Sequence, residues 1–196
     1  MELKNGIKTF YAKSEKQWRD WLRKNHKIEK SVWLIIYKKE SNTPSIYYSE
    51  AVDQALCFGW IDSKANKRDD NSYYQYFSKR NAKSNWSKIN KDKVEKLSLA
   101  GMIEPAGLEM INIDMESGTW NKLDGVDSLA IPEDLQKLFN IHKSALRNWN
   151  DFSRSSRRAI LEWIQNAKRP ETRMKRISET IRLAGLNKKA NQPGSD

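Results

Sequence analysis

The chain has 196 residues, a formal net charge of +11 at pH 7 and a hydrophobic content of 38%. This length fits one domain of ordinary size, or one domain with a smaller appendix, and it excludes a large multidomain enzyme. The composition lies near that of disordered chains, but eight Trp and seven Tyr supply large rings that can fill a core. We therefore expect a fold that is built around aromatic side chains.

Several classes of protein are excluded by residues that the sequence lacks. No stretch has the roughly 18 consecutive apolar residues of a membrane span, and residues 1–10 lack the apolar core of a secretory signal. We therefore expect a cytoplasmic protein. One cysteine and two histidines cannot supply the four ligands of a structural zinc site, and there is no dinucleotide or phosphate-loop motif. We expect no metal and no cofactor, while the oligomeric state stays open.

The first half of the chain mixes helix and strand signals. Ser14 and Gln17 form a capping box before apolar residues at helical spacing, so a helix is predicted over residues 14–24. An uninterrupted apolar run over residues 32–37 predicts a strand that is buried on both faces. Ser49 is then predicted to cap a short helix.

A β-hairpin is predicted next, because two strand-like segments, residues 60–64 and 72–77, flank the charged and turn-rich residues 66–71. Alternation along the second strand divides its aromatic side chains between the two faces, with Tyr74 and Tyr76 on one and Tyr73 and Phe77 on the other. Beyond the hairpin, Ser87 caps a predicted helix that ends at Gly101.

The remainder of the sequence reads as helices. Pro105 opens one to about residue 115, and three more are predicted beyond Pro132, the second capped by Ser153 and the third running from Pro170 to Gly185. The predicted organisation is an α+β domain (1–116), a linker (117–131), a helical part (132–186) and a disordered tail (187–196). The fold class is α+β, with a small, mainly antiparallel sheet, packing helices and a three-helix C-terminal part.

Three short motifs carry a resemblance to a known family: C-F-G-W-I-D-S at 57–63, F-S-K-R at 77–80 and S-N-W-S-K-I-N at 84–90. Together with motifs in the C-terminal third, they resemble the bacteriocin-protection, YdeI or OmpD-associated (OmdA-like) family over roughly residues 10–185. The sequence departs at Ser78 and Lys79, where the family usually has Pro and Arg, so Arg80 is the retained guanidinium. The resemblance implies a link to bacteriocin or antimicrobial-peptide protection and supplies no catalytic residue.

The same motifs contain the residues of a predicted polar pocket. Asp62 and Arg80 lie on neighbouring strands, and the helix start at Ser87 offers free N–H groups to an anion. We expect non-enzymatic binding of a small anionic ligand by Trp60, Asp62, Arg80, Ser84, Trp86, Ser87 and Asn90. A purely structural interpretation, in which Asp62 and Arg80 form a buried ion pair and Ser87 only caps its helix, stays open.

Two alternatives belong to other functional classes. Arg169, Arg173 and Arg176 recur at i, i+4, i+7 spacing, so the basic C-terminal helices could track the phosphates of a nucleic acid or another polyanion. This nucleic-acid hypothesis is not favoured, because basic and acidic residues paired at i, i+4 spacing are typical of a solvated helix face. An enzyme would use Cys57 as nucleophile or the Asp62 pocket.

Overall fold

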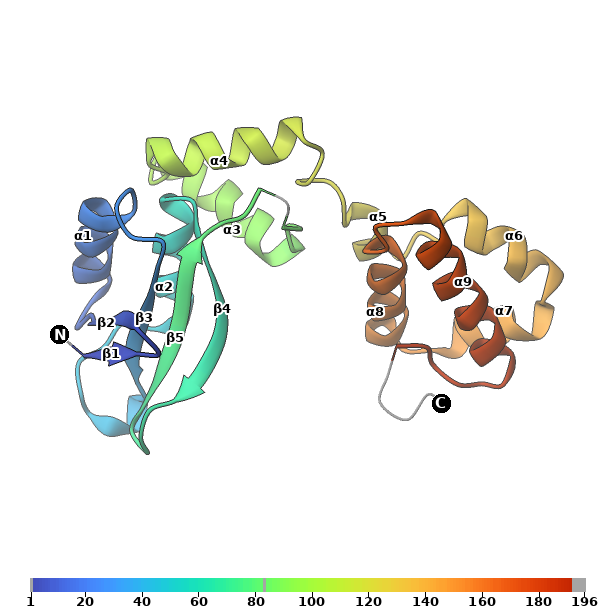
Figure 1. The fold of residues 1–196 in the computed structure, drawn as a ribbon, viewed down its shortest axis with the longest axis horizontal. Coiled ribbons are helices and arrows are strands. Elements are labelled where there is room, and N and C mark those ends of the chain that lie inside the picture. The colour runs from blue at the N-terminus through green and yellow to red at the C-terminus, as the bar shows by residue number, and fades with distance from the viewer. Residues whose placement is uncertain (1, 83, 192–196) are drawn as a thin grey trace. The chain divides into compact units, whose positions relative to one another are not determined.

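The computed structural model describes residues 2–82 and 84–191. Its chain divides into two compact units, Met1–Trp120 and Asn121–Asp196 (Figure 1). The first unit combines a five-stranded sheet with helices, and the second is helical. The predicted α+β class is confirmed.

The sheet has the strand order β1-β2-β3-β5-β4. Its strands are β1 (Leu3–Lys4), β2 (Ile7–Tyr11), β3 (Ser31–Tyr37), β4 (Trp60–Lys67) and β5 (Ser72–Lys79). Only the β2–β3 pair is parallel among the described strands, while β1–β2, β3–β5 and β4–β5 are antiparallel. The sheet is therefore mainly antiparallel, as predicted, and β4 and β5 form the predicted hairpin.

One face of the sheet packs on helices to form the main core. The helices of this unit are α1 (Glu15–Asn25), α2 (Tyr48–Cys57), α3 (Lys88–Leu99) and α4 (Pro105–Glu116). Val32, Leu34 and Ile36 of β3 point into this core, where Trp18 of α1 stacks on Trp21 with ring centroids 5.1 Å apart. The prediction that aromatic rings build the core is thus confirmed for this unit.

Two helices of this unit begin at the predicted serine caps. Ser14 and Ser87 are the N-caps of α1 and α3, and each hydroxyl accepts a hydrogen bond from a backbone N–H three residues later. The predicted cap at Ser49 is wrong, because the N-cap of α2 is Tyr47, two residues earlier, and Ser49 lies inside the helix. The Glu50 carboxylate accepts the Tyr47 N–H at 3.0 Å, so an acid in the first turn satisfies the backbone donor of the cap residue.

The second unit has its own apolar core. Its helices are α5 (Asp124–Asp127), α6 (Glu133–Ile141), α7 (Lys143–Asp151), α8 (Arg154–Gln165) and α9 (Pro170–Gly185). The first of the three predicted helices is therefore two helices that meet at His142. One straight helix would place Trp149 about 15 Å along the axis from Phe139, whereas the turn at His142 brings their ring centroids to 5.4 Å.

The predicted tail, residues 187–196, lies partly outside the described residues. In the described part, the Lys188 N–H donates to the Leu183 carbonyl at 2.8 Å, and Ala190 is buried in the core of the helical unit. This core therefore includes chain beyond the end of α9.

Candidate functional site

Asp62 and Arg80, the two charged residues of the predicted pocket, have separate sets of partners in the described structure. Asp62, on β4, accepts hydrogen bonds from the Tyr48 hydroxyl at 2.6 Å and from Gln75 Nε2 at 3.4 Å. Burial, and next the bond to Asp62, raise the pKa of Tyr48, so its hydroxyl keeps its proton. The carboxylate of Asp62 therefore belongs to a local polar cluster between α2 and the sheet, away from the partners of Arg80.

Arg80 is held by an acid that the sequence reasoning did not select. Its Nε donates to Asp114 Oδ2 at 3.0 Å, and both side chains are almost fully buried. Trp86 Nε1 donates to the same oxygen at 2.7 Å, and the guanidinium lies over the Trp86 ring, 3.7 Å from its centroid. The interpretation as an Asp62–Arg80 ion pair is thus wrong, because Asp114 of α4 is the partner of Arg80.

In this Arg80–Asp114–Trp86 cluster, most polar groups of the two buried charged side chains have hydrogen-bond partners. Arg80 Nη2 also donates to the carbonyl oxygens of Ser84 and Asn85, both at 3.0 Å. Burial lowers the pKa of Arg80, and the hydrogen bond and charge of Asp114 oppose that shift. A guanidinium with these partners has its positive charge already neutralised, so an anion would have to compete with Asp114 for it.

Two other predicted residues have structural contacts, although the buried Trp60 Nε1 has no hydrogen-bond acceptor in the described structure. Trp60 is buried against Trp21 in an edge-to-face contact with centroids 5.9 Å apart. Ser87 accepts the Asn90 N–H at 3.3 Å as the cap of α3. A sequence signal for Asp114 did exist: Gly107, Ile111 and Asp114 follow i, i+4, i+7 spacing, and all three are buried.

The environment of Cys57 does not favour nucleophilic chemistry. Its side chain is fully buried in the main core, and burial is the largest cause of the raised pKa of its thiol. Since the thiolate is the nucleophile, a buried thiol with a raised pKa is a poor one.

Arg169, Arg173 and Arg176, the row that could bind phosphates, are not all free to do so. Two of the three side chains already have partners. Arg173 binds Asp134 through two nitrogens, with Nε–Oδ2 at 2.6 Å and Nη2–Oδ1 at 3.0 Å. Arg176 donates to the Trp163 carbonyl, and its guanidinium lies 5.0 Å from the Trp163 ring centroid. Of the three arginine side chains, only that of Arg169, the N-cap residue of α9, has no hydrogen bond or ion pair among the described residues.

The Asp134–Arg173 pair predicts an acid-sensitive step in the stability of the helical unit. The hydrogen bond from Arg173 lowers the pKa of Asp134 below its ordinary value of 3.8 in the folded chain. The folded state therefore binds the proton less readily than the unfolded state. The stabilisation is fully present above about pH 4 and is lost as the pH falls through the lowered pKa. Because the pair is partly exposed, Asp134→Asn should cost about 0.5 to 1 kcal/mol at neutral pH.

Chemical denaturation between pH 2 and 7 measures this difference. Asp134→Asn should flatten the lower part of the profile of unfolding free energy. Glu133→Gln removes an acid from the same turn of α6, where the carboxylate forms an exposed pair with Lys137, and serves as the control. Equal profiles for the two variants would contradict a specific role for Asp134.

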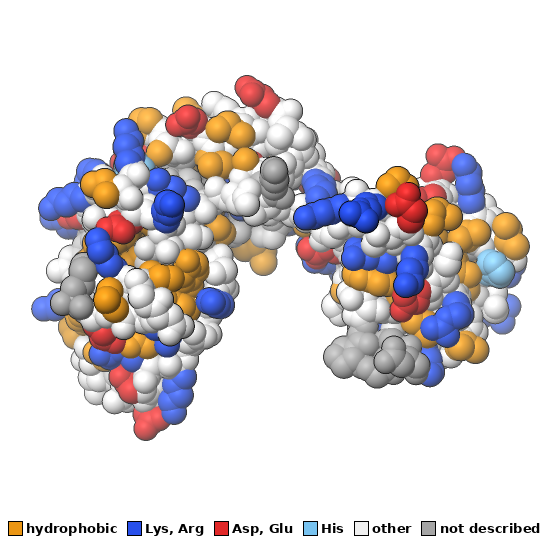
Figure 2. All heavy atoms as spheres, viewed as in Figure 1, with side chains coloured by type: hydrophobic (Ala, Val, Ile, Leu, Met, Phe, Trp, Pro, Cys, Tyr) orange, Lys and Arg blue, Asp and Glu red, His pale blue; other side chains and the backbone are white. Residues whose placement is uncertain are grey.

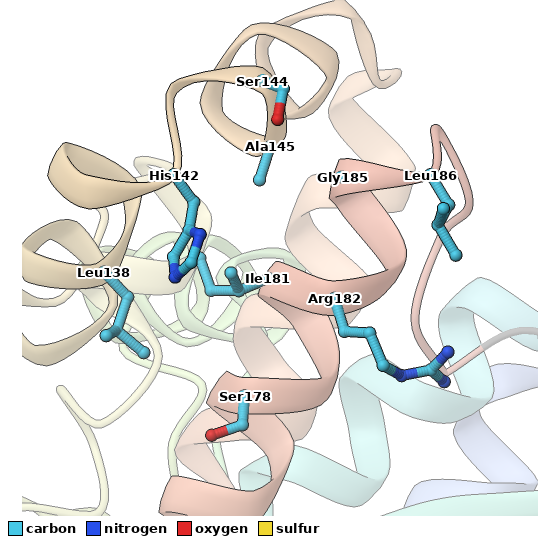
Figure 3. Close-up of a pocket in the computed structure, with 9 residues that line it drawn as sticks. All are labelled: Leu138, His142, Ser144, Ala145, Ser178, Ile181, Arg182, Gly185 and Leu186. Carbon is cyan, nitrogen blue, oxygen red and sulfur yellow. The ribbon is translucent and has the colours of Figure 1, made fainter.

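The helical unit contains a cavity of about 550 Å³ between α9 and the segment where α6 turns into α7 (Figure 3). Its apolar lining comes from Leu138, Ala145, Ile181 and Leu186, and its polar lining from His142, Ser144, Ser178 and Arg182. In Figure 3 the His142 ring lies beside Ile181, and Arg182 extends from α9 on the side of Leu186. The volume is within the range of small-molecule sites, and the lining combines an apolar surface with a few polar groups.

The guanidinium of Arg182 at this cavity is not paired with an acid in the described structure. Arg182 is exposed and has no hydrogen bond or ion pair among the described residues. His142 is also exposed, because it lies where α6 ends and α7 begins. Sequence reasoning missed this cavity because it treated residues 133–149 as one helix with His142 on an apolar stripe. No glycine or proline lies at the turn to signal the break.

No group of three or more His, Cys, Asp and Glu side chains among the described residues could hold a metal ion. No helix in the described ranges is long and apolar enough to span a membrane.

Two protein families match separate parts of the chain. Residues 10–110 match a family described as a domain of unknown function (DUF8412), and this match ends before Asp114. Residues 128–185 match the family described as Bacteriocin-protection, YdeI or OmpD-Associated, and they include every residue that lines the helical cavity except Leu186. Neither the curated proteins nor the solved structures contain a match to this chain.

Proposed function

The chain belongs to the DUF8412 family through residues 10–110 and to the bacteriocin-protection, YdeI or OmpD-associated family through residues 128–185, and we propose that it is a non-enzymatic protein that binds a small anion. The ligand site that we propose is the cavity of the helical unit. The observation that carries the proposal is the unpaired guanidinium of Arg182 beside an apolar lining. At Arg80, by contrast, Asp114 already neutralises the charge.

The chemistry of the lining defines the ligand class. Arg182 can bind a carboxylate or phosphate, and two serine hydroxyls with the His142 ring add hydrogen-bonding groups. Leu138, Ile181 and Leu186 provide apolar contact that a fully polar anion would not use. We therefore propose an amphiphilic anion, with a charged group near Arg182 and an aliphatic or aromatic part against α9.

Decanoate tests this ligand class by calorimetric titration of the full chain. Decanoate should bind, decanol should bind roughly ten-fold more weakly because it lacks the charge, and acetate should give no measurable heat. Arg182→Ala should weaken decanoate binding by roughly ten-fold. Ser178→Phe, at an exposed position of the lining, should weaken it by placing a bulky ring at the cavity wall.

Arg147→Ala is the matched control, because Arg147 is an exposed arginine of α7 that does not line the cavity. It removes the same charge and should leave decanoate affinity unchanged. Equal affinities for decanoate and decanol, or an unchanged affinity in Ser178→Phe, would contradict the proposed site. The description of the family that matches residues 128–185 names bacteriocin protection, and we propose that role here. Ser178→Phe should then weaken the protection that the unchanged chain gives in a survival assay.

A further inference from the structure

The face of the sheet that points away from the main core carries a second aromatic cluster. Trp33, Ile35 and Tyr74 form its buried part, and partly buried side chains of Ile7, Tyr11, Tyr37 and Tyr76 pack against them. All seven come from strands, whereas the cluster on the opposite face includes residues of α1, α2 and α3. Figure 2 shows hydrophobic side chains gathered over the strands of this unit.

Lysine side chains lie over the rings of this aromatic face. Lys4 Nζ is 4.2 Å from the centroid of Tyr74 and 5.5 Å from that of Trp33. Lys64 Nζ lies 5.7 Å from Trp33 and 5.8 Å from Tyr76. Each ammonium group thus lies against aromatic π-systems.

These two lysines differ in how far their charges are offset. Neither side chain has a hydrogen bond or an ion pair within 4 Å among the described residues, but the charge of Lys4 lies near enough to Glu2 to help lower the pKa of that carboxyl. Arg68 is paired with Glu2 and Asp69, and Lys64 has no such acid beside its ammonium group in the described structure. In addition, Trp33 Nε1 is buried without a hydrogen-bond acceptor in the described structure. The face therefore combines aromatic rings, the unpaired cation of Lys64, the partly offset cation of Lys4 and a buried donor without an acceptor.

We propose that this face binds single-stranded nucleic acid. Phosphates would draw the flexible, exposed Lys64 side chain from the ring of Tyr76, and a base would stack on the partly exposed surface uncovered there. Base faces are accessible in single strands but not within a duplex, which selects the single strand. An acidic peptide could satisfy the lysines but has no flat rings to place on Tyr76.

The test uses fluorescence anisotropy of labelled 12-nucleotide oligo-U and oligo-dT with the full chain at low salt. Both single strands should bind, and a duplex of equal length should bind at least ten-fold more weakly. Tyr76→Leu should weaken binding by roughly five-fold or more, while Tyr76→Phe keeps the ring and should retain it. Lys64→Ala should reduce the slope of log affinity against log salt by roughly 0.7, the value for one phosphate contact on a single strand.

Lys96→Ala is the matched charge control, since Lys96 is exposed on α3. Its salt slope should equal that of the unchanged chain. Circular dichroism of each variant checks that the fold is retained. Three results would overturn the proposal: no binding of either single strand, equal binding of the duplex, or equal losses in Lys64→Ala and Lys96→Ala. Displacement of oligo-U by an equal charge of poly-glutamate would also overturn it, because that result identifies a general anion surface.

Discussion

Replacing Asp114 with alanine should lower the free energy of unfolding by about 3 to 5 kcal/mol, the usual cost of leaving one member of a buried ion pair without its partner. Arg80 would keep its charge with no carboxylate beside it, and Trp86 Nε1 would lose its acceptor. Chemical denaturation of the full chain, followed by tryptophan fluorescence, measures the change. The loss should appear in the transition of the unit that contains α4.

An exposed aspartate provides the control for this substitution. Asp92 pairs with Lys88 one turn away on α3, where both side chains are largely in solvent. Asp92→Ala should therefore change the unfolding free energy by no more than about 0.5 kcal/mol. Similar losses in the two variants would contradict a special role for Asp114.

The double replacement separates the value of the pair from the cost of breaking it. Arg80→Met combined with Asp114→Leu removes both charges and keeps apolar volume, so it should recover much of the stability that Asp114→Ala loses. If the cluster instead held an anionic ligand at Arg80, added ligand would stabilise the unchanged chain and not the double variant. Unchanged transitions with added phosphate or decanoate would support a purely structural Arg80.

Much of the fold could be predicted because its signals are local. Ser14, Ser87 and Ser153 each cap a helix through a bond to the third residue that follows, and such a bond requires no knowledge of the tertiary structure. The hairpin could also be predicted, since its two strands are adjacent in the sequence. Alternation along β5 also placed Tyr74 and Tyr76 on one face and Phe77 on the other.

The candidate site was harder to predict because its contacts are distant in the sequence. Arg80 and Asp114 are separated by 34 positions, whereas Asp62 is a closer acid on a paired strand. The sequence near Arg80 therefore favoured the wrong partner. The cavity at Arg182 depends on the turn at His142, and that turn is fixed by the contact between Phe139 and Trp149 rather than by a local breaker.

Replacing Gly107 with alanine should cost about 3 kcal/mol of unfolding free energy, because α4 crosses the end of α2 at this residue. A Cβ atom on Gly107 would lie 2.3 Å from the carbonyl oxygen of Cys57, and this neighbour is backbone that cannot rotate away. The same carbonyl accepts the Glu104 N–H at 3.0 Å, so α4 cannot move outward without breaking that bond. Gly125→Ala is the control, because nothing lies within 4 Å of a Cβ atom at that position. The free energy of unfolding of this variant should stay unchanged or rise by about 0.5 kcal/mol.

The close approach at Gly107 also positions Asp114, two helical turns further along α4, against Arg80. An outward shift of α4 should therefore weaken the ion pair as well as the packing at Cys57. The losses in Gly107→Ala and Asp114→Ala should then overlap, and the double variant should lose less stability than the two single variants added together. Strict additivity in the denaturation experiment would mean that the crossing at Gly107 does not position Asp114.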